Sequence, residues 1–323
     1  MSLEGVRAGG VALVGTTASG KSDLAVAVAR RLGQVELVSM DSMSVYREMD
    51  LATAKPSPAL RAEVPHHLVD VADPSEDYSL ARFAGEARRA LEGIAVRGGR
   101  ALLVGGTGLY VRTVVDQLSL PGRWPDVAAE LDARADRPGG LPELHRRLTT
   151  LDPVAAGRIE PTNRRRVVRA LEVTLGSGRP FSSFGPGLQA YGPTPFAIIG
   201  VPFDPPAVDR RIAERFDGWL AAGLVEEVRH LAGRTGGLSR TARQALGYRE
   251  LLAHVESGVP LERCVADAVR ATRRFARRQW AWFRRDPRIR WLRVDEDREA
   301  TLLAALVATG GSPGAPAVLG AAR

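Results

Sequence analysis

The sequence predicts an α/β protein in which a parallel sheet, flanked by helices, is interrupted by a helical insertion. Three observations support this fold class. An apolar run at residues 11–14 leads through a glycine-rich loop into a helical pattern, and strand-like runs alternate with helical patterns over the first 115 residues. Strand-like patterns are then missing between about residues 116 and 190. The alternation is typical of a doubly wound parallel sheet.

The elements of the first part follow in order. Gly10–Val14 predicts a strand, and apolar residues at helical spacing predict a helix over Ser22–Leu32. A second strand covers Val35–Met40 and ends at Asp41; a helix at Leu80–Val96 then leads to a third strand. That strand, residues 101–104, ends in Gly105-Gly106-Thr107-Gly108.

Capping signals mark helices inside the insertion. Asp152-Pro153 reads as an N-cap followed by proline at the first helical position, and Asn163 is placed to cap a helix that ends near Gly176. We therefore predict four regions: a first part of the core at 1–115, a helical insertion domain at 116–190, core completion with basic C-terminal helices at 191–310, and a disordered tail at 311–323.

The third region returns to strand character at Pro195–Val201 and then becomes helical. We expect helices at Val208–Gly223, Leu224–Ala232, Thr241–Val255 and Pro260–Phe283, followed by a late strand at 289–294. The Ala/Gly/Pro-rich segment after Val307 predicts disorder.

Composition narrows the class of protein. The chain of 323 residues is 45% hydrophobic, which is enough to bury a sizeable core, and no run approaches the roughly 20 apolar residues that span a bilayer. We expect a cytoplasmic protein without a membrane partner, acting as a monomer.

The net charge of +8 is concentrated near the C-terminus. Between Arg270 and Arg293 there are ten arginines and one acid, Asp286. Such local basicity predicts a surface that binds a polyanion, although a charged helix face that only meets water is an open alternative.

Lysine is rare in this chain. Among 45 basic residues, only Lys21 and Lys55 are lysines, so both mark places where a compact ammonium is required and a planar guanidinium does not fit.

The strongest motif is Gly15-Thr16-Thr17-Ala18-Ser19-Gly20-Lys21-Ser22, which fits the P-loop pattern G-x-x-x-x-G-K-[ST] between a strand and a helix. In such a P-loop NTPase-like fold, backbone amides and the helix N-terminus hold phosphate oxygens, Lys21 neutralises them, and the Ser22 hydroxyl binds Mg²⁺. The loop does not reveal whose phosphates it holds.

The carboxylate companion of an ATPase is missing from the third strand, which ends in Gly-Gly-Thr. The nearest carboxylate at a strand end is Asp41, on a strand that we expect to neighbour the P-loop strand. Asp41 is a candidate general base; the alternative is that it caps a helix starting at Met43.

A series of blocks resembles the bacterial tRNA dimethylallyltransferases, also called isopentenyl-diphosphate:tRNA transferases. The blocks occur in order over about residues 11–292 and include Asp41-Ser42-Met43-Ser44-Val45-Tyr46-Arg47, Thr53-Ala54-Lys55-Pro56, Pro65-His66-His67-Leu68-Val69-Asp70, Leu103-Val104-Gly105-Gly106-Thr107-Gly108-Leu109-Tyr110, Asp152 to Ala156, Asn163 to Val173, Gln244-Ala245-Leu246-Gly247-Tyr248 and Thr272 to Phe283.

The resemblance implies transfer of a dimethylallyl group from dimethylallyl diphosphate to the exocyclic amine of the adenosine 3′ of the anticodon. Asp41 matches the family's general base, and Thr107 matches a residue lining the passage where the two substrates meet. Arg211 and Arg215, one helical turn apart, are expected to help Lys21 hold the leaving diphosphate. Alternatively, Thr107 only forms a tight turn and the arginines pair with acids beside them.

The partner that the resemblance implies is the anticodon loop of tRNA, with the target nucleotide flipped out of the loop. Three stretches are expected to contact it: Asp41, Ser42, Met43 and Ser44; Asn163, Arg164, Arg165, Arg166 and Val167; and Arg243, Gln244, Ala245, Leu246, Gly247 and Tyr248.

Three positions depart from the family pattern. Thr16 stands where proline is usual, Ser44 where glutamine is usual, and Glu48 where glycine is usual. Thr16 should leave the loop intact, Ser44 puts a base contact in question, and Glu48 is expected to alter the turn after Tyr46.

Other functions fit some of the same residues. An adenylate prenyltransferase would share the P-loop and Asp41 but act on free AMP or ADP. A small-molecule kinase would take ATP as phosphate donor and use Arg211 and Arg215 in its lid. A nucleic-acid-binding protein would retain the P-loop only as a structural relic.

Overall fold

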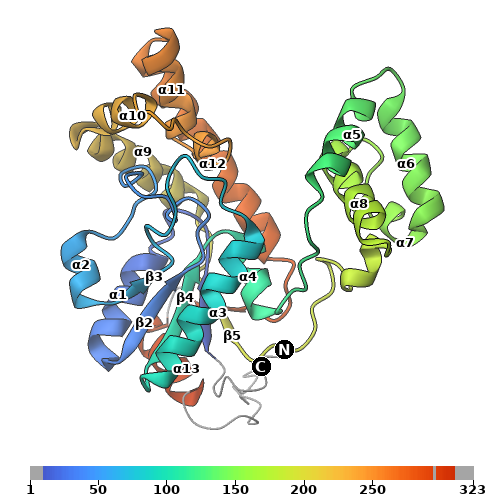
Figure 1. Ribbon diagram of the computed structural model, residues 1–323. Helices are drawn as coiled ribbons and strands as arrows, with labels where there is room; N and C mark the ends of the chain where they lie inside the picture. Colours follow the sequence, from blue (N-terminus) through green and yellow to red (C-terminus); the bar gives the residue numbers. More distant parts are fainter. Residues whose placement is uncertain (1–9, 294–295, 310–323) are drawn as a thin grey trace. The chain divides into compact units, whose positions relative to one another are not determined.

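The computed structural model describes residues 10–293 and 296–309. Its described residues form two compact units (Figure 1). The core unit combines residues up to Asp116 with those from Pro193 onward, and the helical unit covers Gln117–Gly192. The segment predicted as a disordered tail, 311–323, lies outside the described residues.

A six-stranded parallel sheet forms the centre of the core unit, in the order β3-β2-β4-β1-β5-β6. This arrangement confirms the predicted fold class. The strands are β1 Val11–Val14, β2 Val35–Ser39, β3 His66–His67, β4 Arg100–Gly105, β5 Ala197–Gly200 and β6 Arg290–Trp291.

One prediction about the sheet is wrong. We expected β2 to neighbour the P-loop strand β1, but β4 lies between them and pairs with both. The strand that follows a helix in sequence need not be the next strand in space, since the crossover through α1 leaves one position open and β4 fills it later.

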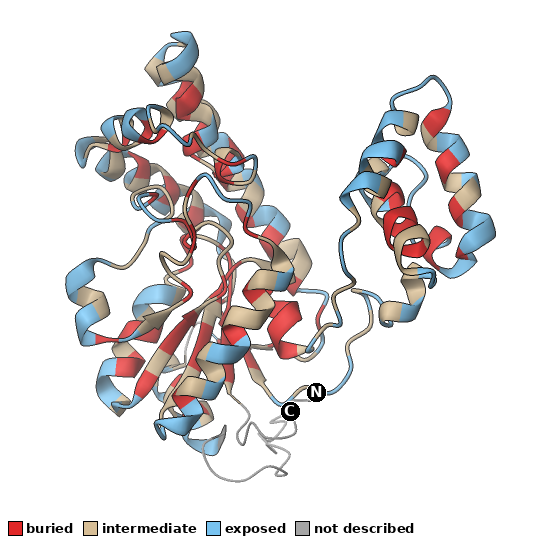
Figure 2. Cartoon of the chain, viewed as in Figure 1, coloured by how far each residue is buried: buried red, intermediate tan, exposed pale blue. Residues whose placement is uncertain are grey.

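Helices cover both faces of the sheet. On one side, α3 and α4 pack over a core that includes Phe83, Leu103 and Val111; on the other, α1 and α13 cover Val28, Leu102 and Leu302. Figure 2 shows the buried residues concentrated along the strands. The helices of the core unit are α1 Lys21–Leu32, α2 Pro58–Glu63, α3 Leu80–Val96, α4 Gly108–Val115, α9 Pro205–Ala221, α10 Leu224–Ala232, α11 Tyr248–Ser257, α12 Leu261–Phe283 and α13 Arg298–Thr309.

Two differences from the predicted helices have local causes. The helix expected over Thr241–Val255 is broken into a 3₁₀ turn, Ala242–Gln244, and α11, because Gly247 adopts φ 88° just before α11 begins. The sequence analysis also missed α13, whose Leu302 and Leu306 are buried against α1 although the segment looks like the start of a tail.

The helical unit has its own hydrophobic core, built from residues such as Leu131, Leu144, Leu148 and Leu171. The predicted caps are present: Asp152 accepts a hydrogen bond from Ala155 N, and Asn163 accepts one from Arg166 N. Its helices are α5 Pro125–Ala135, α6 Gly140–Leu151, α7 Pro153–Ala156 and α8 Arg164–Ser177, followed by a 3₁₀ turn at Phe181–Phe184.

Candidate functional site

The P-loop, residues 15–22, connects β1 to the first turn of α1. Gly20 and Ala18 both adopt positive φ values, 87° and 57°. The second is unfavourable for a residue with a side chain, but the Ala18 methyl packs in a cluster with Ile212 and Phe216 of α9 and Ala276 of α12. Packing by two later helices therefore holds the loop in shape.

Lys21 has an unusual environment at the start of α1. Its Nζ donates a hydrogen bond to Thr16 O at 3.1 Å. Burial lowers the pKa of Lys21 from 10.5 to about 8; the nearby Asp41 carboxylate opposes this and raises the pKa, whereas Arg215 lowers it further. The ammonium therefore lies within electrostatic reach of both residues and lacks a counter-ion strong enough to restore its ordinary pKa.

Two hydroxyls of the P-loop lack a hydrogen-bond partner among the described residues. The hydroxyls of Thr16 and Ser19 are buried and find no hydrogen-bond partner in the described part of the chain. Ser22 is exposed at the same helix N-terminus. Orphaned polar groups beside a helix N-terminus are suited to an anion such as a diphosphate.

The residues also fit Mg²⁺ shared with a substrate. In the described residues no group of three or more His, Cys, Asp or Glu side chains is placed to hold a metal. Mg²⁺ commonly takes one or two protein oxygens together with substrate phosphates and water, and the exposed Ser22 hydroxyl can be such an oxygen. Ser22 is therefore the protein group that would hold the ion.

Asp41 follows β2 at the carboxyl edge of the sheet. Its Oδ1 accepts hydrogen bonds from Met43 N at 2.7 Å and Ser44 N at 3.2 Å. Within residues 10–293 and 296–309 no hydrogen bond reaches Oδ2, so one oxygen fixes the side chain and the other is free to accept a proton.

The alternative role of Asp41, as the cap of a helix starting at Met43, is wrong because no helix starts there. Asp41 does accept backbone amides as a cap would, but the residues after it form turns and no helix begins at Met43. Tyr46 N instead closes a turn onto Met43 O.

Thr107 lies beside this turn, at the N-terminus of α4. Its Oγ1 accepts a hydrogen bond from Ser42 N at 3.3 Å, and its own N–H donates to Met40 O at 3.3 Å. A Cβ at Gly105 would lie 2.4 Å from Met40 O, so glycine is required for the two strand ends to approach. The geometry joins the Thr107 turn directly to Asp41.

Arg211 and Arg215 lie on α9 and approach the P-loop. Arg211 Nη1 donates a hydrogen bond to Ala18 O at 3.2 Å. Burial lowers the pKa of the Arg215 guanidinium, and Asp23 partly offsets this. The alternative was that these arginines pair with acids beside them. Glu214, one of those acids, has its Oε1 3.9 Å from Arg210 Nε. The two arginines therefore add positive charge beside Lys21.

Comparison with known proteins identifies relatives over most of the chain. Residues 44–286 match the model of the IPP transferase family. The tRNA dimethylallyltransferase of Streptomyces coelicolor is 47% identical over 282 residues, which cover 87% of this chain and 89% of that protein. The chain belongs to the tRNA dimethylallyltransferase family.

Solved structures agree with this assignment. The full-length tRNA isopentenylpyrophosphate transferase from Bacillus halodurans is 35% identical with a TM-score of 0.66, covering 94% of this chain and 98% of its own. A eukaryotic dimethylallyltransferase described as acting on tRNA gives a TM-score of 0.73 at 26% identity, covering 85% of this chain and 70% of its own.

A second relative by sequence is the tRNA dimethylallyltransferase of Thermobifida fusca, which is 46% identical over 88% of this chain and 90% of its own.

The stretches predicted to contact tRNA differ in what they expose. In the first, Ser42 and Met43 are partly exposed, but Ser44 is buried and its hydroxyl lies 3.0 Å from that of Ser39. In the second, Asn163, Arg165 and Arg166 are exposed. The Ser44 side chain is therefore buried against Ser39 and is not exposed to a base in this structure.

Other members of these stretches have structural roles. Val167 is fully buried in the core of the helical unit, and Arg164 pairs with Asp132 and Asp136. Tyr248 is also fully buried, and its hydroxyl donates to Glu227 at 2.5 Å. The Val167 and Tyr248 side chains are therefore part of the hydrophobic core, and contact of these stretches with tRNA stays a prediction.

The third stretch is divided in the same way. Gln244 is exposed, while Arg243 and Leu246 are partly exposed. Ala245 and Gly247 are buried, and Arg243 pairs with Glu256 at 2.5 Å. Gln244 is thus the residue of this stretch best placed to meet a ligand.

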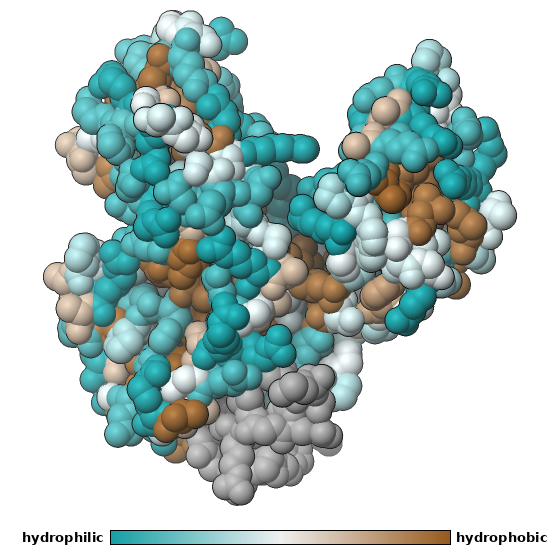
Figure 3. All heavy atoms as spheres, viewed as in Figure 1, coloured by the Kyte–Doolittle hydropathy of each residue, from teal (hydrophilic) through white to brown (hydrophobic). Residues whose placement is uncertain are grey.

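The basic segment is less uniform than its sequence indicates. Arg273 and Arg277 face Asp209, and Arg288 pairs with Asp116 and Asp286. Four other arginines, two on α12 and two directly after its end, are exposed and form no ion pair in the described part of the chain. We refer to them as the α12 arginine set: Arg274, Arg278, Arg284 and Arg285. Figure 3 shows mostly hydrophilic residues over the visible face of α9 to α12.

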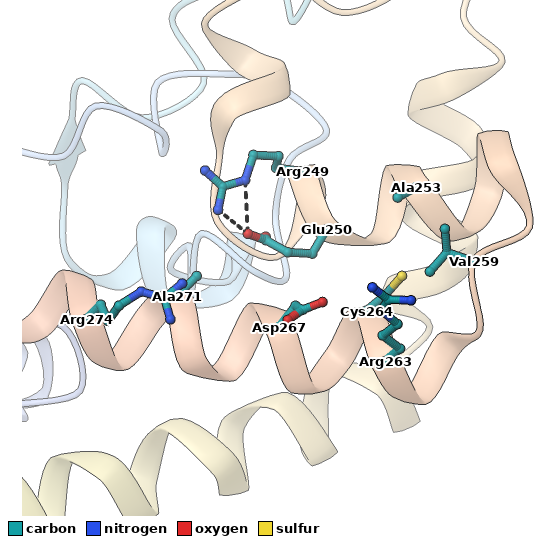
Figure 4. A pocket seen from close by; sticks show the side chains of 9 residues that line it. All are labelled: Arg249, Glu250, Ala253, Val259, Arg263, Cys264, Asp267, Ala271 and Arg274. Carbon is teal, nitrogen blue, oxygen red and sulfur yellow. Dashed lines mark hydrogen bonds and ion pairs between the residues drawn. The ribbon is translucent and has the colours of Figure 1, made fainter.

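A separate cavity of about 430 Å³ lies between α11 and α12 (Figure 4). Its lining includes Arg249 and Glu250, which pair with each other, and Asp267, which pairs with Arg270. No P-loop residue lines the cavity, and neither do Asp41, Thr107, Arg211 or Arg215. We therefore place it outside the active site.

The departure at Glu48 has a structural explanation. Glu48 adopts φ 61°, a conformation that glycine takes without strain and other residues take at a cost of roughly 1–2 kcal/mol. Arg234 donates to both carboxylate oxygens at 2.5 Å, and His230 lies 3.1 Å away. Hydrogen bonds from Arg234 lower the pKa of Glu48, so the ion pair holds the charged side chain in the strained turn.

Lys55, the second lysine, is held by hydrogen bonds beside the loop that follows Asp41. Its buried ammonium donates to Tyr46 O at 2.5 Å, to Asp50 at 2.6 Å and to Asp70 at 2.5 Å. Three acceptors around one nitrogen suit an ammonium and not a planar guanidinium. The scarcity of lysine therefore pointed to a structural position here.

Sequence reasoning missed Gln279 of α12. This side chain is 6% exposed and contacts both the P-loop and the turn before Thr107. A single glutamine within an arginine-rich helix forms no pattern that would have singled it out. Only its place in the basic segment that resembles the family could have drawn attention to it.

Proposed function

We propose that this protein transfers the dimethylallyl group of dimethylallyl diphosphate to the N6 amine of the adenosine 3′-adjacent to the anticodon of tRNA. The proposal is carried by the convergence of Lys21, Asp41 and Arg215 at the carboxyl edge of the sheet in a member of this family. One group of this set is free to accept a proton, and the other two suit a diphosphate.

Binding of the donor follows from the charges. Phosphate oxygens would meet the helix N-terminus at Lys21 and the hydroxyls of Thr16 and Ser19, while Arg211 and Arg215 approach from α9. An anion bound beside the Lys21 ammonium raises its pKa, which keeps the side chain charged and strengthens the contact. Mg²⁺, when bound at Ser22, supplies further charge neutralisation of the diphosphate.

The transfer itself needs a base and a stabilised leaving group. The bond from N6 to the prenyl carbon forms as the carbon–oxygen bond to the diphosphate breaks, and its electron pair leaves with the diphosphate. The N6 proton passes to Asp41 Oδ2, while Oδ1 keeps its hydrogen bonds to Met43 N and Ser44 N. Fixed cations at the growing negative charge then lower the barrier.

The tRNA would meet exposed cations. The α12 arginine set is suited to phosphates, and Arg165 and Arg166 of α8 are exposed as well. Backbone contacts of this kind position a nucleic acid without reading its sequence.

No helix in the described residues is long and apolar enough to cross a membrane.

One assay tests the proposal. Purified protein is incubated with radiolabelled dimethylallyl diphosphate and tRNA, AMP or ATP, and the labelled product is identified. We expect label in tRNA, at the adenosine beside the anticodon. Label in AMP or ATP would contradict the proposal, as would phosphate transfer from ATP.

A further inference from the structure

Gln279 connects two parts of the active site that are distant in sequence. Its Oε1 accepts a hydrogen bond from Thr17 N at 2.8 Å, and its Nε2 donates to Gly106 O at 2.9 Å. Gln279 is 6% exposed and Gly106 is buried, so the hydrogen bond between them is shielded from water, whereas Thr17 is partly exposed. One carboxamide thus bridges the P-loop and the end of β4.

The surroundings leave little freedom for this bridge. A Cβ at Gly106 would lie 2.4 Å from Gln279 Nε2 and 3.0 Å from Gly15 O. Trp282 lies one turn after Gln279 on α12, and a Cβ at Gly108 would lie 2.2 Å from its Nε1. The glycines therefore let α12 press directly against the backbone on both sides of Thr107.

The hydrogen bonds continue from Gly106 to the residues on either side of Asp41. Thr107 follows Gly106, accepts a hydrogen bond from Ser42 N, and donates its N–H to Met40 O. Ser42 and Met40 flank Asp41. A continuous path therefore runs from the diphosphate loop through Gln279 to the carboxylate that removes the proton.

We propose that Gln279 is a positioning residue that fixes the distance between the diphosphate loop and the Asp41 base. This inference rests on the proposed function, because it assigns the two ends of the path to the two substrates. Reacting groups need near-attack geometry, and a displacement of about 1 Å can cost about 10²-fold in rate. Gln279 touches neither substrate in this scheme and acts through Thr17 and Gly106.

The test uses Gln279→Leu, which keeps the bulk of the side chain and removes both hydrogen bonds. We expect the single-turnover prenylation rate at saturating substrates to fall about 10²-fold. The Kd for tRNA should stay within twofold of the wild-type value, because the α12 arginine set is unchanged. A fall in rate without weaker tRNA binding is the split that a positioning role predicts.

A stability control separates positioning from loss of fold. Ala271 is buried on the same helix, two turns before Gln279, and lines the cavity between α11 and α12 that lies outside the active site. Ala271→Gly should lower the melting temperature through helix propensity, yet keep the rate within threefold of wild type. Rates that simply follow melting temperature in both variants would overturn the positioning role.

A second variant perturbs the bridge from the other side. Gly106→Ala should push Gln279 Nε2 away, and it replaces Gln279→Leu as the test if that protein does not fold. If both act on one contact, the double variant loses little more rate than the worse single variant; independent, multiplying losses would contradict the inference.

The outcomes also separate this inference from the proposed function. A wild-type protein that labels no tRNA overturns both. An active wild type with an equally active Gln279→Leu variant overturns only the positioning role.

Discussion

Replacing Asp41 by asparagine removes a proton acceptor while keeping the shape of the loop. Asparagine retains an oxygen for Met43 N and Ser44 N, which Asp41 Oδ1 holds at 2.7 and 3.2 Å. We therefore expect a nearly unchanged melting temperature. The amide cannot take up the N6 proton, and loss of a general base typically lowers kcat by about 10²-fold or more.

The structure adds a second consequence of this substitution. The Asp41 carboxylate raises the pKa of Lys21, which burial has already lowered to about 8. Without that carboxylate the pKa of Lys21 falls further, so the side chain loses its charge at a lower pH in the variant than in the wild type. Affinity for the diphosphate should then begin to decline at a lower pH in the variant than in the wild type.

Single-turnover prenylation at pH 7, with both substrates saturating, isolates the chemical step from this effect on binding. Asp41→Ala is the matched control for the loop, and it should cost about 1 kcal/mol of stability because both backbone amides lose their acceptor. An asparagine variant whose rate lies within about threefold of wild type would remove Asp41 from the mechanism.

Three further predictions concern the basic residues. Lys21→Ala and Lys21→Arg should each lower prenyl transfer by orders of magnitude, and near-normal turnover of the arginine variant would show that a compact ammonium is not required there. Replacing three members of the α12 arginine set by glutamine should reduce the salt dependence of tRNA binding by roughly one unit of slope per lost phosphate contact, whereas Arg277→Gln, which removes a partner of Asp209, should leave the slope nearly unchanged; equal effects would argue for a solvated helix face. Lys55→Met should lower the free energy of unfolding in urea by about 2 kcal/mol, less than is typical for a fully buried pair because Asp70 keeps its contact with Arg61, and a loss below about 0.5 kcal/mol would refute this structural role.

Local features of the site could be predicted from the sequence. The spacing of glycines and lysine from Gly15 to Ser22 predicts a loop between a strand and a helix, because the whole pattern lies within a few neighbouring residues. Asn163 and Asp152 cap helices as predicted for the same reason. The apolar runs at β1, β2 and β4 were also recognisable, although the ends of the elements shifted by one or two residues.

Features that depend on distant contacts could not be predicted. Nothing in the neighbourhood of β2 indicates that β4 will separate it from β1, since strand order is decided by residues some 60 positions later. Tyr248 belongs to a stretch expected to contact tRNA, but its side chain is buried and its hydroxyl donates to Glu227 of α10. Gln279 likewise acquires its role only when α12 meets two loops, 262 and 173 residues earlier in the chain.

The insertion of the helical unit between β4 and β5 has a consequence for synthesis of the chain. β1 pairs with β4 on one side and with β5 on the other, and α9 and α12, which hold Ala18, follow later still. At about 5–20 residues per second, the ribosome needs roughly 10–40 s to pass from β1 to β5. The helical unit, whose core is local, is complete before β5 emerges, so the nascent P-loop strand waits with one edge unpaired and is then the segment most in need of a chaperone.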